Sequence, residues 1–153
     1  MRSSLLLSLL VVSVSFACKC AQRPAKEAFC SADWVSRARI AQSVTVQIDE
    51  GFDGTQFGVE HIEIFRSRNN ETVLPEIVHT ASHSAACGLS LDVGEEYLLS
   101  GSMINETLRV TSCGQIRPEG LAKEVSGIVI EWSNVPKEFP EEMKKFECPP
   151  KEE

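Results

Sequence analysis

The stretch SFACKCAQRPAKEAFC, residues 15–30, holds three of the six cysteines of this 153-residue chain. Cys18 and Cys20 stand one residue apart, at the point where an apolar leader ends. They cannot easily bond to each other, because a disulfide that closes so small a ring strains its own geometry. We therefore predict that they bond to different partners and fix the start of the domain, where a chain end would normally fray.

The segment before this pair predicts a secretory signal peptide over residues 1–17. It has a basic residue near its start, an apolar run over residues 5–14 and a small-x-small end at residues 15–17. The apolar run is too short to span a bilayer. Cleavage after Ala17 would make Cys18 the first residue of a secreted, extracellular protein, and no later run is long enough for a membrane span.

The rest of the chain fits one domain over residues 18–148, followed by a charged tail over residues 149–153. The formal net charge of -7 argues against nucleic acid or an anionic membrane as a partner. Two sequons predict N-glycosylation of Asn70 and Asn105 in surface loops, as expected for an exported protein.

All six cysteines lie after the leader, and an even count in an oxidising compartment predicts disulfides. Six cysteines allow 15 pairings, so the count alone does not select one. Zinc binding by thiolates is the competing interpretation. It is disfavoured because Cys87, Cys113 and Cys148 lack the C-x2-C spacing of structural zinc sites.

The order of hydrophobic patterns and turn residues predicts a mainly β domain. A helix is expected over residues 24–33, strands over 34–48, 56–65, 72–81, 96–104 and 107–112, and helices over 117–132 and 140–148. The turns DEGFDG and NE predict that the first two strands and the last two strands form hairpins. These elements favour a five-stranded, OB-like Greek-key barrel with flanking helices, with a β-sandwich as the alternative.

A cysteine at a mature N-terminus also offers a metal-binding group. Its α-amino nitrogen and its carbonyl oxygen can close a five-membered chelate once the amine, with a reference pKa of about 7.7–8.0, is deprotonated. A catalytic zinc keeps one position open for water or substrate. A terminal residue held rigidly at Cys18 could take that position on another protein, because little affinity would be lost to ordering it.

The residues that carry this chemistry resemble the tissue inhibitors of metalloproteinases, a family within the wider netrin-like module. The matching stretches are CKCAQRPAKEAFCSADWVSRARI at residues 18–40, SAACGLSLDVGEEYLLSG at 84–101 and VTSCGQI at 110–116. They correspond to the N-terminal, inhibitory domain of that family. The resemblance implies an OB-like barrel and the disulfides Cys18–Cys87, Cys20–Cys113 and Cys30–Cys148.

The resemblance also implies which residues contact a target protease. Cys18 would ligate the target's catalytic zinc through its amine and carbonyl, and Lys19 would enter the primed-side specificity pocket. Family members usually carry Thr or Ser at the position of Lys19. The remaining contact residues would be Cys20, Ala21, Ser84, Ala85, Ala86, Cys87 and Gly88.

Together these features predict a monomeric, secreted and extracellular inhibitor. Its targets would be secreted or cell-surface zinc metalloproteases of the matrix metalloproteinase type. It would have no catalytic residues and no cofactor of its own, because the zinc belongs to the target. One alternative is an enzyme, but His61, His79 and His83 form neither an HExxH motif nor a nucleophile elbow. The other is a netrin-like module that binds a receptor, growth factor or host protein without inhibiting a protease.

Overall fold

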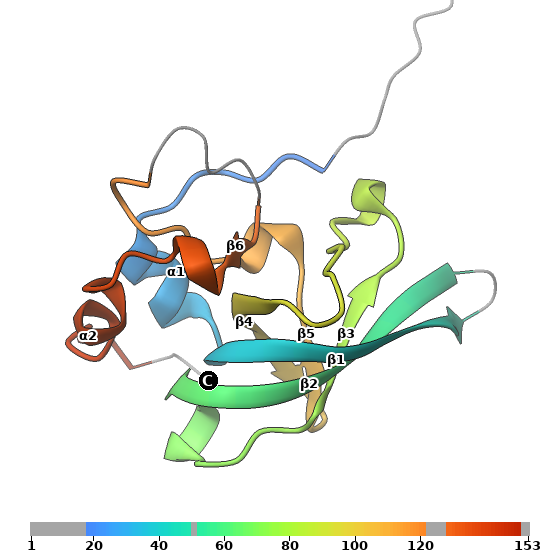
Figure 1. The fold of residues 1–153 in the computed structure, drawn as a ribbon, viewed down its shortest axis with the longest axis horizontal. Coiled ribbons are helices and arrows are strands. Elements are labelled where there is room, and N and C mark those ends of the chain that lie inside the picture. Colours follow the sequence, from blue (N-terminus) through green and yellow to red (C-terminus); the bar gives the residue numbers. More distant parts are fainter. Residues whose placement is uncertain (1–17, 50–51, 122–127, 151–153) are drawn as a thin grey trace, which may run out of the picture.

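Strands β1 to β5 close into a barrel, the short strand β6 pairs with β4 at the end of the same sheet, and the two helices of the described residues pack against the outside of the barrel (Figure 1). The computed structural model describes residues 18–49, 52–121 and 128–150, so the predicted signal peptide and most of the predicted tail lie outside the described residues. The helices and strands are α1 (Ala25–Ser31), β1 (Trp34–Asp49), β2 (Phe52–Arg66), β3 (Ile77–Ala81), β4 (Glu96–Ile104), β5 (Thr107–Arg109), β6 (Ile130–Glu131) and α2 (Phe139–Met143). Short 3-10 turns are η1 (Arg68–Asn70), η2 (Ser84–Ala86), η3 (Ser112–Gly114) and η4 (Trp132–Asn134).

The long strand β1 closes the barrel because it pairs on both sides. Along its length it is antiparallel to β2, and its first part, from Trp34 to Arg39, is also antiparallel to β4. Strand β3 pairs with β2 and runs parallel to β5, and β5 returns to β4. The predicted five-stranded barrel and both predicted hairpins are therefore confirmed.

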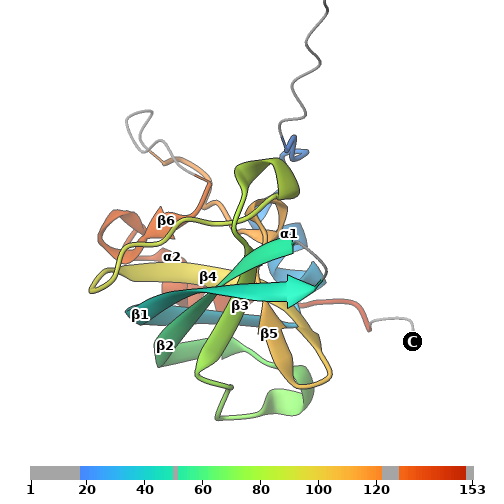
Figure 2. The same cartoon turned by 90° about the vertical axis from the view of Figure 1, so that its right-hand side faces the viewer.

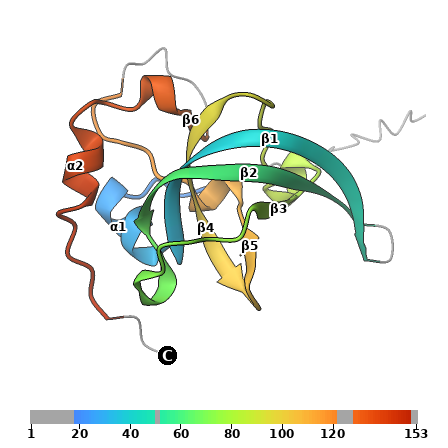
Figure 3. The same cartoon turned by 60° about the horizontal axis from the view of Figure 1, so that its bottom comes forward.

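Two apolar clusters hold the domain together. One fills the barrel around Trp34, Phe57 and Leu99, and the indole Nε1 of Trp34 donates to the Ser102 carbonyl at 3.1 Å. The other lies between the barrel and the two helices, which Figure 3 shows on the same side of the barrel. Its members include Phe29 of α1. Burial of each such large side chain contributes about 1.5–3 kcal/mol.

The region after Cys113 corrects the sequence prediction. A helix was expected over residues 117–132, but residues 117–121 form no helix and residues 130–131 form β6; residues 122–127 lie outside the described residues. Ile130 is 1% exposed because β6 pairs with β4, opposite Leu98. The β-branched residues 128–130 suit this half-buried edge better than a helix. Among the described residues, no helix has the length and hydrophobicity needed to cross a membrane.

The predicted strand over residues 72–81 begins only at Ile77. Pro75 cannot donate a hydrogen bond to a neighbouring strand, so the preceding segment stays outside the sheet. The predicted strand over residues 107–112 likewise ends at Arg109, where the chain turns towards η3.

A charged network attaches η4 to the barrel wall. Arg37 and Arg39 each approach Glu96 to 2.6 Å, and these two guanidinium groups lower the pKa of Glu96, with Arg37 the larger cause. The guanidinium of Arg37 also lies 4.8 Å from the ring centroid of Trp132, which stacks on Phe65 at 5.9 Å. A cation over an aromatic face adds to the packing of the C-terminal segment.

His61 is half-buried and both of its ring nitrogens have partners. The Ser36 hydroxyl lies 2.8 Å from Nδ1, and the Pro75 carbonyl oxygen lies 2.9 Å from Nε2. Because a carbonyl oxygen only accepts, Nε2 carries the proton and Nδ1 accepts from Ser36 in the neutral ring. Burial lowers the pKa of His61 below its ordinary value.

We expect the stability of the fold to decrease as the pH falls below about 6.5, the ordinary pKa of histidine. The unfolded chain binds this proton more readily than the folded protein does. The contribution of His61 to stability is therefore fully present above the unfolded-state pKa and is lost as the pH falls towards the lower folded-state pKa. The pKa of His79 is also lowered, by burial and then by Arg109, and adds to the trend. Thermal unfolding between about pH 7.5 and 5.5 should show a shallower slope for His61→Asn, and the shallowest for His61→Asn with His79→Asn. An unchanged slope in the double variant would contradict the assignment.

Candidate functional site

The N-terminal segment, residues 18–24, crosses one end of the barrel beside η2 and η3 (Figure 1). Two disulfides hold it there. Cys18 bonds to Cys87 at the end of η2, with 5.3 Å between the Cα atoms, and Cys20 bonds to Cys113 in η3, with 5.0 Å between them. The third disulfide joins Cys30 and Cys148. These are the three pairs that the resemblance implied.

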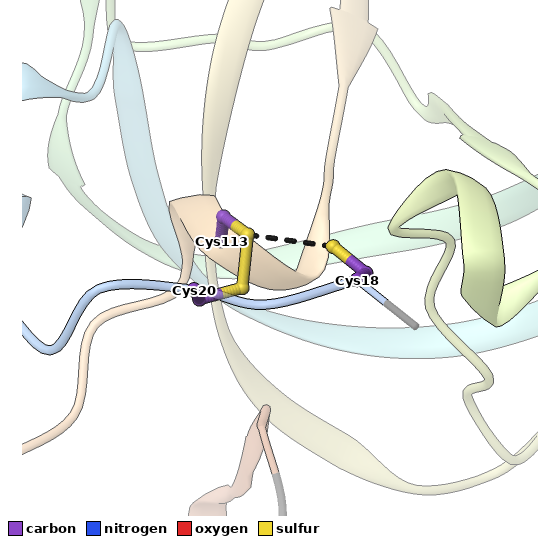
Figure 4. Close-up of side chains that lie close together, drawn as sticks. All are labelled: Cys18, Cys20 and Cys113. Atoms are coloured by element: carbon purple, nitrogen blue, oxygen red, sulfur yellow. Dashed lines mark hydrogen bonds between the residues drawn. A yellow bond between two sulfur atoms is a disulfide. The ribbon is translucent and has the colours of Figure 1, made fainter. Parts of the chain in front are cut away.

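The two N-terminal disulfides lie against each other. Figure 4 shows the Cys20–Cys113 bond with the sulfur of Cys18 directed towards it, and the Sγ atoms of Cys18 and Cys113 are 3.6 Å apart. Cys87 Sγ is 3.9 Å from Cys113 Sγ. The sulfur atoms of Cys18, Cys20 and Cys113 lie close enough together to suggest a metal site. Because every cysteine is disulfide-bonded, none of them is a thiolate ligand.

Ser112 joins the two disulfides through hydrogen bonds, and sequence reasoning missed it. It is 5% exposed, and its backbone N–H donates to the Cys87 carbonyl at 2.8 Å. Its hydroxyl lies 3.6 Å from Cys18 Sγ and 3.8 Å from Cys20 Sγ. Its position before Cys113 was the only sequence signal, and that gave no indication of these contacts.

Arg23 fixes the far end of the N-terminal segment. Its guanidinium donates to the Cys113 carbonyl at 3.1 Å and to the Ser31 hydroxyl at 3.0 Å. The segment is thereby tied to η3 and to α1 as well as to the disulfides.

Gln115 holds η3 on β4 through its side-chain amide. Nε2 donates to the carbonyls of Ser100 and Thr111 at 2.8 and 2.9 Å, and Oε1 accepts from the Ser100 backbone N–H at 3.2 Å. The Ser100 hydroxyl donates to the Gly114 carbonyl at 2.7 Å. Neither Arg23 nor Gln115 could be identified from the sequence, because their hydrogen-bond partners become apparent only in the folded chain.

The loop that carries Cys87 is held closely against the end of β3. Cys87 has a φ of +60°, and the backbone N–H of Gly88 donates to the His83 carbonyl at 3.1 Å. A Cβ atom at Gly88 would collide with the Ala81 carbonyl oxygen, so a side chain there would push the loop away from β3. Next along the chain, the Leu89 N–H donates to the hydroxyl of Thr80 at 3.0 Å.

The two attached segments form one surface feature, which we call the N-terminal ridge, residues 18–21 and 84–88. The side chains of Lys19, Cys20 and Ala21 and those of residues 84–86 are exposed, whereas Cys18, Cys87 and Gly88 are half-buried. The fold thus brings together every residue that the resemblance assigned to target contact. The ridge presents backbone groups and one ammonium group. Within the described ranges, no group of histidine, cysteine or acidic side chains other than Cys18, Cys20 and Cys113 lies close enough together to hold a metal ion.

Comparisons with known proteins identify relatives of this chain. A sequence model described as "Tissue inhibitor of metalloproteinase" matches residues 16–122. The Caenorhabditis elegans protein "Putative metalloproteinase inhibitor tag-225" is 34% identical over 152 residues, which are 95% of this chain and 96% of the relative. "Metalloproteinase inhibitor 2" is 36% identical over 112 residues in Canis lupus familiaris and 33% over 110 residues in Homo sapiens; each match covers 67% of this chain and 49% of the relative. The chain therefore spans about half the length of these two mammalian relatives.

Proposed function

The chain belongs to the tissue inhibitor of metalloproteinase family, and from this membership we propose that it is a secreted inhibitor of zinc metalloendopeptidases that acts through its N-terminal ridge. Members of this family inhibit metalloproteinases and are not enzymes. The observation that carries the proposal is the disulfide between Cys18 and Cys87, which joins two exposed segments into one projection. A preformed projection loses less free energy to ordering when it enters a cleft than a flexible peptide does.

The proposed mechanism starts with removal of the signal peptide after Ala17, which exposes the amine of Cys18. This amine and the Cys18 carbonyl oxygen would then chelate the catalytic zinc of the target and displace its bound water. The structure supports this role because Cys18 cannot move away from Cys87, and Ser112 contacts its sulfur. The inhibitor would bring no cofactor of its own, because the metal belongs to the target.

The other ridge residues would occupy the cleft on both sides of the zinc. Lys19 would enter the specificity pocket and Ala21 would follow along the primed side, while Ala85 and Ala86 would lie on the unprimed side. Small, exposed side chains at 84–86 let the backbone approach the walls of a narrow cleft. We propose that residues 18–148 act as a monomer in this way.

The direct test is an inhibition panel with the mature protein. The N-terminus is first read by mass spectrometry, because a retained Ala17 would replace the chelating amine with an amide. The protein is then assayed against secreted and cell-surface metalloproteases whose specificity pockets are apolar or acidic. We expect reversible, competitive inhibition of at least one of them. A protein that starts at Cys18 and inhibits no member of the panel would refute the proposal.

Lys19 is expected to select among targets. An ammonium group at the end of an apolar pocket loses its water without gaining a partner, whereas an acidic or open pocket can accept it. Lys19→Thr should therefore tighten inhibition of a protease with an apolar pocket by about 10-fold, or about 1.4 kcal/mol. Lys19→Arg keeps the charge and serves as the control, without tightening. Equal or weaker inhibition by Lys19→Thr would count against Lys19 as the pocket residue.

A further inference from the structure

A groove of about 430 Å³ lies between β2 and the chain that connects it to β3. We call it the β2–β3 groove; its walls include Ile62, Ile64 and Phe65 from β2 and Asn70 and Thr72 from the connection. Its volume is within the range of sites that hold small molecules. Ile62 is 38% exposed, so part of this apolar wall faces solvent.

Asn70 stands at the edge of this groove in a fixed, exposed turn. It has a φ of +55°, a conformation that asparagine adopts more readily than most residues. The turn is closed by the Ser67 hydroxyl, which donates to the Glu71 carbonyl at 2.6 Å. Arg68 adds an ion pair to Asp33 at 3.4 Å. These contacts fix the backbone of the turn, and the exposed side chain of Asn70 lies beside the apolar wall.

The same asparagine begins the sequon Asn70-Glu71-Thr72. We propose that Asn70 carries an N-linked glycan whose first N-acetylglucosamine lies in the β2–β3 groove. In the attachment step, Asn70 Nδ2 forms a bond to C1 of the first sugar of a lipid-linked oligosaccharide. The C1–O bond to the lipid diphosphate breaks, the diphosphate leaves with the electron pair, and the amide gives up one proton.

The chemistry of the groove suits this occupant. A pyranose ring has an apolar C–H face that can cover Ile62, the exposed residue of the apolar wall. Its hydroxyl and acetamido groups can reach water or the polar side chains that also line the groove, among them Arg66 and Glu71. A second hollow of about 410 Å³ shares His61, Ile64 and Thr72 with the groove and also includes Val73, which is 77% exposed. The apolar surface thus continues beyond the first sugar, and the attached glycan is an occupant that the chain itself anchors there.

The second sequon provides an internal comparison. Asn105 is exposed at the tip of the β4–β5 turn, with a φ of +49°, and does not line either hollow. Both η1 and the β4–β5 turn lie at the end of the barrel opposite the N-terminal segment (Figures 1 and 2). Glycans at either position would leave the N-terminal ridge uncovered, so this proposal does not depend on the inhibitory function.

The test uses the full chain secreted from eukaryotic cells that make only high-mannose glycans. Peptide mass spectrometry measures occupancy at Asn70. Endoglycosidase H then trims each glycan to a single N-acetylglucosamine, and thermal unfolding compares this form with variants that lack one glycan. We expect the trimmed protein to unfold at the temperature of the fully glycosylated one, and Asn70→Gln to unfold about 4 °C lower. Asn105→Gln, the matched control, should leave the unfolding temperature unchanged.

A second pair of variants separates the effect of the glycan from that of the turn, because glutamine adopts a positive φ less readily than asparagine does. Thr72→Ser keeps the sequon and Thr72→Ala removes it, while both delete the same methyl group and keep Asn70. Thr72→Ala should unfold at the lower temperature and Thr72→Ser at the higher one. An unmodified Asn70 in the secreted protein would overturn the proposal. So would equal unfolding temperatures for the trimmed protein and Thr72→Ala.

Discussion

Adding one alanine before Cys18 is expected to weaken inhibition of a target metalloprotease by more than about 100-fold. Changing only the groups around a metal's ligands already reduces metal affinity by about 10–100-fold. The extension turns the amine of Cys18 into an amide, which cannot give a neutral nitrogen lone pair to zinc. It also places an extra residue where the target's zinc would have to approach. The inhibition constant is measured against a protease that the native protein inhibits.

The matched control for this experiment carries the alanine after Glu153 instead. It should inhibit as the native protein does, and both variants should unfold at the native temperature, because neither alters the disulfides or the barrel. Unchanged inhibition by the N-terminally extended protein would mean that the ridge does not act through its amine. If the native protein also fails to inhibit any protease, the netrin-like binding module becomes the better interpretation.

The second large effect concerns stability. Replacing Cys30 and Cys148 together by alanine is expected to lower the free energy of unfolding by about 2–5 kcal/mol, because the crosslink joins residues that are 118 positions apart. For a domain of this size the unfolding temperature should fall by about 10 °C or more. Inhibition at 25 °C should be unchanged, since Cys18 and Cys20 keep the ridge attached through their own partners.

Thermal unfolding and the inhibition constant separate the two effects. Replacing Cys20 and Cys113 by serine is the comparison, because that pair lies directly under the ridge and its loss should weaken both stability and inhibition. If the Cys30 and Cys148 variant lost inhibition while still folded, the C-terminal segment would have to contribute to target binding.

The barrel could be predicted because its signals are local. Alternating apolar residues, together with turns of Gly, Asp and Asn, indicated the hairpins β1–β2 and β4–β5 without any knowledge of the tertiary fold. The helix expected over residues 117–132 was wrong where the chain is described, because the pairing of Ile130 with β4 outweighed the helix signal of a proline followed by an acid.

The candidate site, too, could be predicted only in part. The resemblance supplied the residues of the ridge, but the contacts of Ser112, Arg23 and Gln115 could not be read from the sequence. Arg23 meets the carbonyl of a residue 90 positions away, and Ser112 meets sulfur atoms 94 and 92 positions away. A single polar residue carries no periodic pattern, so only the folded chain identifies its partner.

The charged network around Trp132 gives the protein two separate optical reporters. The chain has two tryptophans: Trp34 is fully buried in the barrel, and Trp132 is half-buried on η4, beneath the guanidinium of Arg37. Because the indole inside the barrel is shielded from solvent dipoles, we expect it to emit fluorescence at a shorter wavelength than the partly exposed indole on η4. Detachment of the C-terminal segment therefore changes the spectrum of one chromophore while the other still records an intact barrel.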